Sequence, residues 1–110
     1  MHWPKNKLIN ELAKQFYHTF YQHCWPTNQK PDLQELSIDQ SYQVQDLVTN
    51  MRLEKGEEVI GFKVGCTSHA IQSQFRLNEP ICARLFSPHV ISEGVRLNWK
   101  NYLNCAIEPE

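Results

Sequence analysis

Helical spacing of apolar residues in the first half of the chain is the feature that most restricts its fold. Apolar side chains recur every three or four residues from Leu8 to Cys24, which is the period of an α-helix with one buried face. Pro4 is acceptable in a first helical turn, whereas Pro26 and Pro31 cannot continue a helix. The sequence therefore predicts an amphipathic helix that ends near the segment CWPTNQKPD.

A second helix is indicated after Ser37. Ser37 and Gln40 have the spacing of a capping box, in which two residues exchange hydrogen bonds across the first turn. The expected buried stripe of this helix consists of Val44, Leu47, Val48 and Met51. Gly56, in the segment EKGEE, is expected near its carboxyl-terminal cap. Two helices thus account for residues 5–55.

The residue types change after Gly56. The segment EVIGFKVGCTS is rich in β-branched and aromatic residues and predicts a strand over 59–65. A short helix capped by Thr67 or Ser68 should follow, and then a strand near 83–86. Further short strands are expected in SEGVRL and in the closing segment NCAIEPE. The expected fold class is α+β, with one domain over 1–110 that is helical over 5–55 and strand-rich over 57–110.

Charge, apolar runs and cysteines exclude several classes of protein. Eleven basic and twelve acidic residues give a net charge of -1, so nucleic acid is not an expected partner. No apolar run approaches the roughly 20 residues needed to cross a bilayer, and no signal-peptide core is present. We therefore expect a cytoplasmic protein without a membrane partner. Its four cysteines are scattered, which favours buried free thiols over disulfides or a zinc site.

Two carboxylates close the chain. Residues two apart on a strand point to the same face, so Glu108 and Glu110 would project together. Two carboxylates so near to each other raise each other's pKa unless a cation lies between them. Mg²⁺ takes oxygen ligands of this kind. The alternative is a solvated acidic pair at a frayed terminus. The residues alone leave both interpretations open.

Lys63 lies between two glycines in the run GFKVG. On a strand it would point away from the side on which Phe62 and Val64 lie, toward a cleft or toward water. Beside a metal, such a lysine could bind a substrate carboxylate or carry a proton. The alternative is an ordinary exposed lysine. Arg84 could pair with a carboxylate or be a solvated rim residue, and His69 is expected on the surface.

Taken in order, the segments SIDQSYQVQDLV, GEEVIGFKVGCTSHAIQSQFRLNEPICARLF and AIEPE resemble the N-terminal half of the 2-keto-4-pentenoate hydratase / 4-oxalocrotonate decarboxylase family. This family lies within the fumarylacetoacetate hydrolase superfamily. The resemblance runs from Ser37 to Glu110. It implies the first strands of a fumarylacetoacetase-like mixed β-roll, with the remainder of that roll outside these 110 residues.

The resemblance also implies a set of site residues. Lys63 would be catalytic, and Glu108 and Glu110 would supply two of three carboxylate ligands to Mg²⁺ or Mn²⁺. The expected substrate-binding residues are Gly65, Thr67, Ser68 and Arg84. Where hydratases of the family usually have an aspartate after a proline, this chain has Ile81, and Ala83 replaces the usual glycine. Hydratase chemistry that uses this aspartate is therefore not expected.

The implied function is lyase chemistry, hydration or decarboxylation, on a small 2-keto acid with a divalent metal. A 2-keto acid is the expected small-molecule partner, and a homo-oligomer is the expected assembly. Because the third carboxylate is absent from the resembling segments, the chain alone is expected to be inactive. The alternative is a non-catalytic fragment or oligomerisation module.

Overall fold

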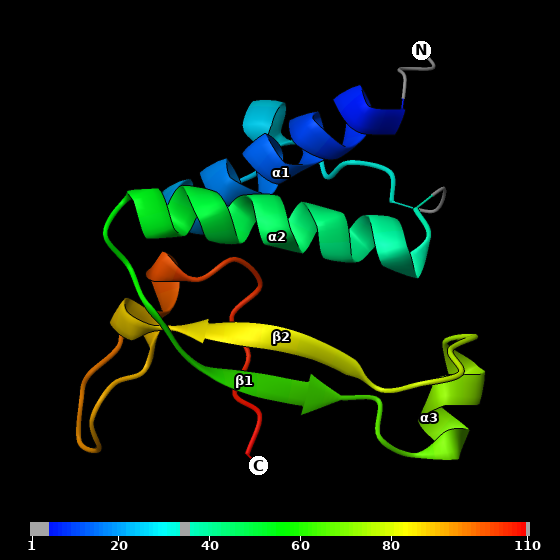
Figure 1. Cartoon of the computed structure of the whole chain (residues 1–110). Helices are drawn as coiled ribbons and strands as arrows, with labels where there is room; N and C mark the ends of the chain where they lie inside the picture. Colours follow the sequence, from blue (N-terminus) through cyan, green and yellow to red (C-terminus); the bar gives the residue numbers. More distant parts are fainter. Residues whose placement is uncertain (1–4, 34–35, 110) are drawn as a thin grey trace. The chain divides into compact units, whose positions relative to one another are not determined.

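The computed structural model describes residues 5–33 and 36–109 (Figure 1). Its helices are α1 (Lys5–Gln22), α2 (Ile38–Glu54) and α3 (His69–Gln74), and its strands are β1 (Val59–Gly65) and β2 (Ile81–Phe86). Short 3₁₀ turns are η1 (Pro26–Asn28), η2 (Ser87–His89) and η3 (Trp99–Asn101). The chain divides into two compact units, 1–52 with 93–110, and 53–92. The α+β class predicted from the sequence is confirmed.

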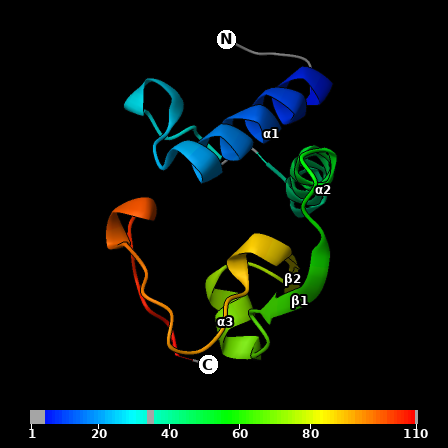
Figure 2. The same cartoon turned by 90° about the vertical axis from the view of Figure 1, so that its left-hand side faces the viewer.

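The core of the first unit lies between α1 and α2, which Figure 2 shows side by side with α2 seen end-on. Leu12 is only 2% exposed. The buried cluster consists of Ile9, Leu12, Ala13 and Val44, with Leu8, Phe16, Leu33, Leu36, Leu47, Val48 and Met51 packed around it. These are the stripes that the helical spacing predicted. The predicted stripe of α1 is wrong at its end: Phe20 is 42% exposed, and Cys24 lies beyond the helix and is exposed.

A buried arginine joins the ends of the two long helices. Arg52, in the last turn of α2, is 6% exposed. Its guanidinium carbon lies 4.2 Å from the ring centroid of Phe20 and 6.0 Å from that of Tyr21, both on α1. Stacking on aromatic faces is a favourable environment for a desolvated guanidinium. Arg52 therefore extends the contact between the helices beyond their aliphatic stripe.

The predicted helix ends are confirmed. Ser37 and Gln40 form the reciprocal hydrogen bonds of a capping box at the start of α2. Gly56 follows the end of α2 with φ +100°, and its N–H donates to the carbonyl oxygen of Leu53 at 3.0 Å. Glycine adopts this left-handed region without a steric penalty. Local signals in the sequence were sufficient to place both ends of this helix.

The second unit contains an antiparallel pair of strands and a short helix. In the register of β1 and β2, Phe62 lies opposite Arg84 and Lys63 opposite Ala83, with an irregularity between residues 59 and 61. β2 begins at Ile81, earlier than the sequence predicted. Ser68, and not Thr67, caps α3. The strand pair is therefore the frame on which the predicted site residues of this unit are placed.

Two predicted strands are wrong. Residues 92–98 and the described part of the closing segment, 104–109, contain no strand. A strand requires a partner, and within the described residues only β1 and β2 pair. The side chain of Ile107 is 93% exposed, so its apolar character does not stabilise an extended pairing there. The strand geometry that would project Glu108 and Glu110 together thus has no basis here, and Glu110 lies outside the described residues.

The cysteines are free, as predicted, but the predicted burial is wrong. Cys24, Cys82 and Cys105 are exposed, and Cys66 is half-buried. The second unit has few buried positions, because its two-stranded sheet has no further layer within that unit. Within the described ranges, no helix is both long and apolar enough to span a bilayer.

Candidate active-site segment on the β1–β2 pair

Lys63 lies at the middle of one face of the strand pair, between two glycines of its own strand. Gly61 and Gly65 are two residues before and after it on β1, and Ala83 is directly opposite on β2. Residues that alternate along a strand, and residues directly opposite in an antiparallel pair, share a face. Lys63 therefore has no large side chain beside it on its own strand or directly across from it. Leu85 and Ile81, directly opposite Gly61 and Gly65, are the large side chains of the same face. We call this face, with Gly61, Lys63, Gly65, Ile81, Ala83 and Leu85, the Lys63 face.

Each glycine of the Lys63 face lies beside an aliphatic side chain of β2. A β-carbon at Gly61 would lie 3.6 Å from Cδ1 of Leu85, and one at Gly65 would lie 3.5 Å from Cγ1 of Ile81. These are ordinary contact distances, so an alanine would fit at either position. The space at each glycine is thus bordered by Leu85 or Ile81, and the residue directly opposite Lys63 is the small Ala83.

The opposite face of the strand pair carries Phe62, Val64, Cys82 and Arg84. Phe62 is 65% exposed and Val64 is 58% exposed. As predicted, the pleat directs Lys63 away from them, but neither residue is buried in a core. Arg84 is half-buried and lies opposite Phe62. The pair does not bring Arg84 and Lys63 to one face, and a substrate-binding role for Arg84 stays a prediction.

The turn between β1 and α3 brings the other predicted substrate-binding residues next to the end of the Lys63 face. Gly65 ends β1, and Thr67 and Ser68 follow, both exposed. The Oγ of Ser68 accepts a hydrogen bond from the N–H of Ile71 at 3.2 Å. A serine that caps a helix by accepting a hydrogen bond can still donate its own hydroxyl hydrogen to an anion. Lys63 and this turn thus belong to one continuous segment.

A residue that sequence reasoning missed holds this turn from within α3. Gln72 is 7% exposed, and its side-chain Nε2 donates to the carbonyl oxygen of Cys66 at 2.9 Å. Nothing in the segment HAIQSQF distinguishes Gln72 from Gln74, which is exposed. The path of the turn alone decides that Gln72 is buried against it and that Gln74 is exposed to solvent.

The described residues do not form a complete metal site. Glu108 is exposed and lies in a segment without regular secondary structure, in a different unit from Lys63. No group of three or more His, Cys, Asp or Glu side chains within the described part of the chain could hold a metal ion. Carboxylate oxygens are suitable donors for Mg²⁺, but one exposed carboxylate does not supply the shell that this ion requires.

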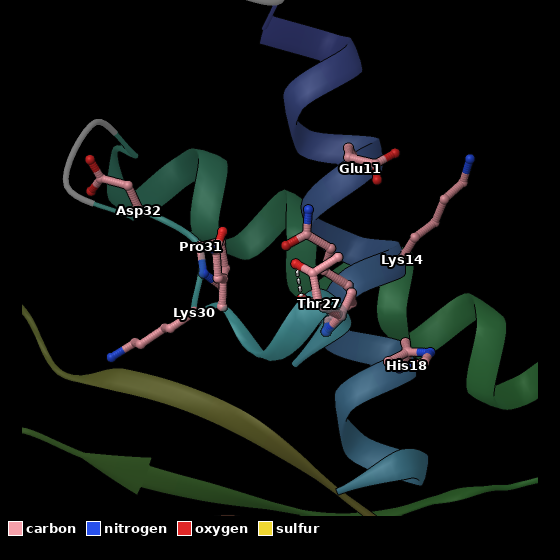
Figure 3. Close-up of a pocket in the computed structure, with 10 residues that line it drawn as sticks. Glu11, Lys14, His18, Thr27, Lys30, Pro31 and Asp32 are labelled. Atoms are coloured by element: carbon pink, nitrogen blue, oxygen red, sulfur yellow. Dashed lines mark hydrogen bonds between the residues drawn. The ribbon is translucent and has the colours of Figure 1, made fainter. Parts of the chain in front are cut away.

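A separate hollow of about 710 Å³ lies in the first unit beside α1 and η1. Figure 3 shows Lys14 and His18 extending from α1, while Lys30 and Asp32 extend away from them. Its charged groups are of both signs and do not converge on a common point. A specific binding site has a few polar groups directed at one ligand position, so this hollow is not the candidate site.

Comparisons with known proteins find hydratases and a decarboxylase. No family model matches the chain. It is 31% identical over 87 residues to 2-hydroxypent-2,4-dienoate hydratase of Pseudomonas putida, covering 79% of this chain and 39% of the hydratase. It is 29% identical over 75 residues to 4-oxalocrotonate decarboxylase of a Pseudomonas species, covering 68% of this chain and 29% of that protein. The chain thus spans less than half the length of these relatives.

The structures agree with the sequences. The 4-oxalocrotonate decarboxylase from Pseudomonas putida G7, complexed with magnesium and adipate, matches 78% of this chain and 33% of its own, with a TM-score of 0.63 and 22% identity. The same enzyme complexed with calcium and acetate matches with a TM-score of 0.64.

The chain therefore has the α+β fold of a part of this decarboxylase. In sequence, the chain is similar to the 2-keto-4-pentenoate hydratases and 4-oxalocrotonate decarboxylases, over a part of their length. The resemblance drawn from the motifs is confirmed.

Proposed function

We propose that this chain provides part of the active site of a divalent-metal-dependent lyase that acts on a small 2-keto acid. The observation that carries this proposal is the 31% identity to a hydratase over 79% of the chain. The fold match to a decarboxylase supports it. Hydration and decarboxylation of such substrates both develop negative charge on a 2-oxo oxygen. A site for this chemistry needs cationic groups near that oxygen.

In this proposal Lys63 and the turn after it bind the anionic end of the substrate. Lys63 is exposed and the residue directly opposite it is the small Ala83, so a carboxylate can reach its ammonium group from solvent. The hydroxyl groups of Thr67 and Ser68 can donate to the same carboxylate. Lys63 would neutralise charge that develops on the substrate or carry a proton. Arg84, on the other face, would contribute only through a substrate or partner that reaches around the strand pair.

Glu108 and Glu110 are proposed as two carboxylate ligands to Mg²⁺ or Mn²⁺. The magnesium and calcium in the matched decarboxylase structures support a divalent metal, and when bound it would supply Lewis-acid chemistry. Two carboxylates do not complete the shell of Mg²⁺. The proposal therefore requires at least one further ligand, and it predicts no measurable turnover by the 110-residue chain alone.

Ile81 favours decarboxylation over hydration within this proposal. It lies directly opposite Gly65, on the Lys63 face. An isoleucine side chain cannot donate or accept a proton, so it cannot activate a water molecule there as a general base. When the distal carboxylate of 2-oxohex-3-enedioate leaves as CO₂, the electron pair of the broken C–C bond is delocalised onto the 2-oxo oxygen as a dienolate. This step requires stabilisation of that charge and no base at the position of Ile81.

A fusion protein tests the proposal. The full chain would be joined to the part of the Pseudomonas putida hydratase that the match does not cover. We expect Mg²⁺-dependent consumption of 2-oxohex-3-enedioate, and slower or no consumption of 2-hydroxypenta-2,4-dienoate. A fusion that folds and binds Mg²⁺ but consumes neither compound would contradict the proposal. The chain alone is the control, with no expected turnover.

An oligomerisation module is the second candidate. The exposed Phe62 and Val64, on the face opposite Lys63, are the observation that favours it. Light scattering of the purified chain, with and without Mg²⁺, separates the candidates. If the chain forms a stable oligomer and the fusion is inactive, the result supports an oligomerisation module. If the fusion is active and forms a homo-oligomer, the result is compatible with the proposed lyase.

A further inference from the structure

Gln72 is a buried polar residue on a helix that is otherwise largely exposed. It is 7% exposed, whereas Ser73 and Gln74 beside it face solvent. A buried side-chain amide needs hydrogen-bond partners to offset its desolvation. Its Nε2 finds one in the carbonyl oxygen of Cys66, at 2.9 Å. The burial and the hydrogen bond together indicate a side chain held in one position.

Gln72 connects the turn before α3 to the loop after it. Its backbone N–H donates to the carbonyl oxygen of Ser68 at 3.0 Å, and its own carbonyl oxygen accepts from the N–H of Leu77 at 2.7 Å. The side-chain bond to Cys66 is the third link. One residue therefore joins both connections that lead from β1 through α3 to β2.

The link to Cys66 acts on the most restricted part of the turn. Cys66 has φ +54°, in the left-handed region that residues with a β-carbon seldom adopt. Such a conformation persists where surrounding contacts hold it. The amide of Gln72 holds the carbonyl of Cys66, and that carbonyl belongs to the peptide unit that leads into Thr67. The direction in which Thr67 and Ser68 leave the strand is set at this peptide.

We propose that Gln72 is a positioning residue for substrate binding: its side chain holds the Cys66 peptide so that Thr67 and Ser68 face the anionic group beside Lys63. This inference rests on the proposed function, since it assigns Gln72 to the same site. Gln72 does not touch the substrate in this proposal. It acts through the turn.

The first test uses the full chain and the thiol of Cys66 as a local reporter. Iodoacetamide would be added to the parent and to Gln72→Ala, and the modification of each cysteine followed by mass spectrometry. We expect alkylation of Cys66 to become roughly threefold faster or more in the variant, because the turn opens locally. The exposed Cys24 and Cys105 should be unchanged and serve as internal controls. Gln74→Ala is the matched variant, in which no change at Cys66 is expected.

Gln72→Glu keeps the size of the side chain and guards against a variant that fails to fold. An ionised carboxylate cannot donate to the Cys66 carbonyl, so Q72E should also expose Cys66 at neutral pH while its circular dichroism matches the parent. Unchanged alkylation of Cys66 in folded Q72A and Q72E would overturn the inference.

The second test uses the fusion protein that tests the proposed function. For 2-oxohex-3-enedioate we expect Q72A to raise KM by about tenfold with kcat changed by less than about twofold, the signature of lost substrate binding. A merely structural role would reduce the active fraction and so lower kcat without raising KM, and that result would also overturn the inference. If the parent fusion is inactive but Cys66 is exposed in Q72A, the proposed function fails and the positioning of the turn stands.

Discussion

Ser37 and Gln40 exchange two hydrogen bonds across the first turn of α2. The backbone N–H of Ser37 donates to Oε1 of Gln40 at 2.9 Å, and the backbone N–H of Gln40 donates to Oγ of Ser37 at 3.1 Å. We predict that Ser37→Ala lowers the free energy of unfolding by about 1 kcal/mol, because the N–H of Gln40 loses its acceptor. Urea unfolding followed by far-ultraviolet circular dichroism measures this change.

Gln43→Ala is the control for the cap, since Gln43 is an exposed residue of the same helix. Its free energy of unfolding should stay within about 0.5 kcal/mol of the parent. Equal losses in the two variants would show that the cap itself is not the source of the effect.

Leu12 is the most buried large side chain of the α1–α2 cluster, at 2% exposure. Leu12→Ala should lower the free energy of unfolding by about 2–5 kcal/mol, through lost apolar burial and the cavity that remains. The same urea unfolding experiment measures it. Leu53→Ala is the matched substitution at a position that is 45% exposed, and a loss as large as that of L12A would contradict the assignment of the core.

The contact between Arg52 and Phe20 predicts a measurable coupling. The guanidinium carbon lies 4.2 Å from the ring centroid, so we expect a coupling free energy of about 0.5–2 kcal/mol. A double-mutant cycle with Arg52→Met and Phe20→Leu isolates this pairwise contribution to stability. Additive effects of the two substitutions would mean that the ring and the guanidinium do not stabilise each other.

Lys63 should be needed for turnover and not for folding. In the fusion protein, Lys63→Ala is expected to lower kcat by about 100-fold or more, as for the loss of a group that transfers a proton or neutralises charge. Its exposed position on β1 predicts a melting temperature close to that of the parent. Steady-state kinetics and a thermal melt provide both readouts.

Lys14→Ala is the control for Lys63, because Lys14 is an exposed lysine on α1 beside the unrelated hollow. It should retain the activity of the parent fusion. If K63A were as active as K14A, Lys63 would be an ordinary surface lysine.

Local features of the sequence were sufficient for much of the fold. The stripes of α1 and α2, the capping box at Ser37, the glycine after α2 and a cap of α3 at Thr67 or Ser68 all depend on residues within about four positions of one another. Their hydrogen bonds and faces form within a single element, so their spacing predicts them. The strand β1 was predicted with its observed bounds for the same reason, since its β-branched and aromatic residues are contiguous.

The candidate site was predicted in part. The GFKVG run identified Lys63 and the two glycines that share its face, because alternation along one strand decides which residues share a face. Gln72 could not be found in this way. Its burial depends on a hydrogen bond to Cys66, across a turn whose path is not encoded in the spacing of the residues.

Only the tertiary structure decided the features that need a partner from elsewhere in the chain. The segments at 92–98 and 104–109 have strand-like composition but pair with no described strand, so they are not strands. The register of β1 against β2 placed Lys63 and Arg84 on opposite faces, which neither strand determines alone. The sequence by itself determined the helices, their ends and the strand that carries Lys63, since these arise from short-range periodicity. Strand pairing and burial depend on contacts between residues far apart in the sequence. The spacing of neighbouring residues does not predict these contacts.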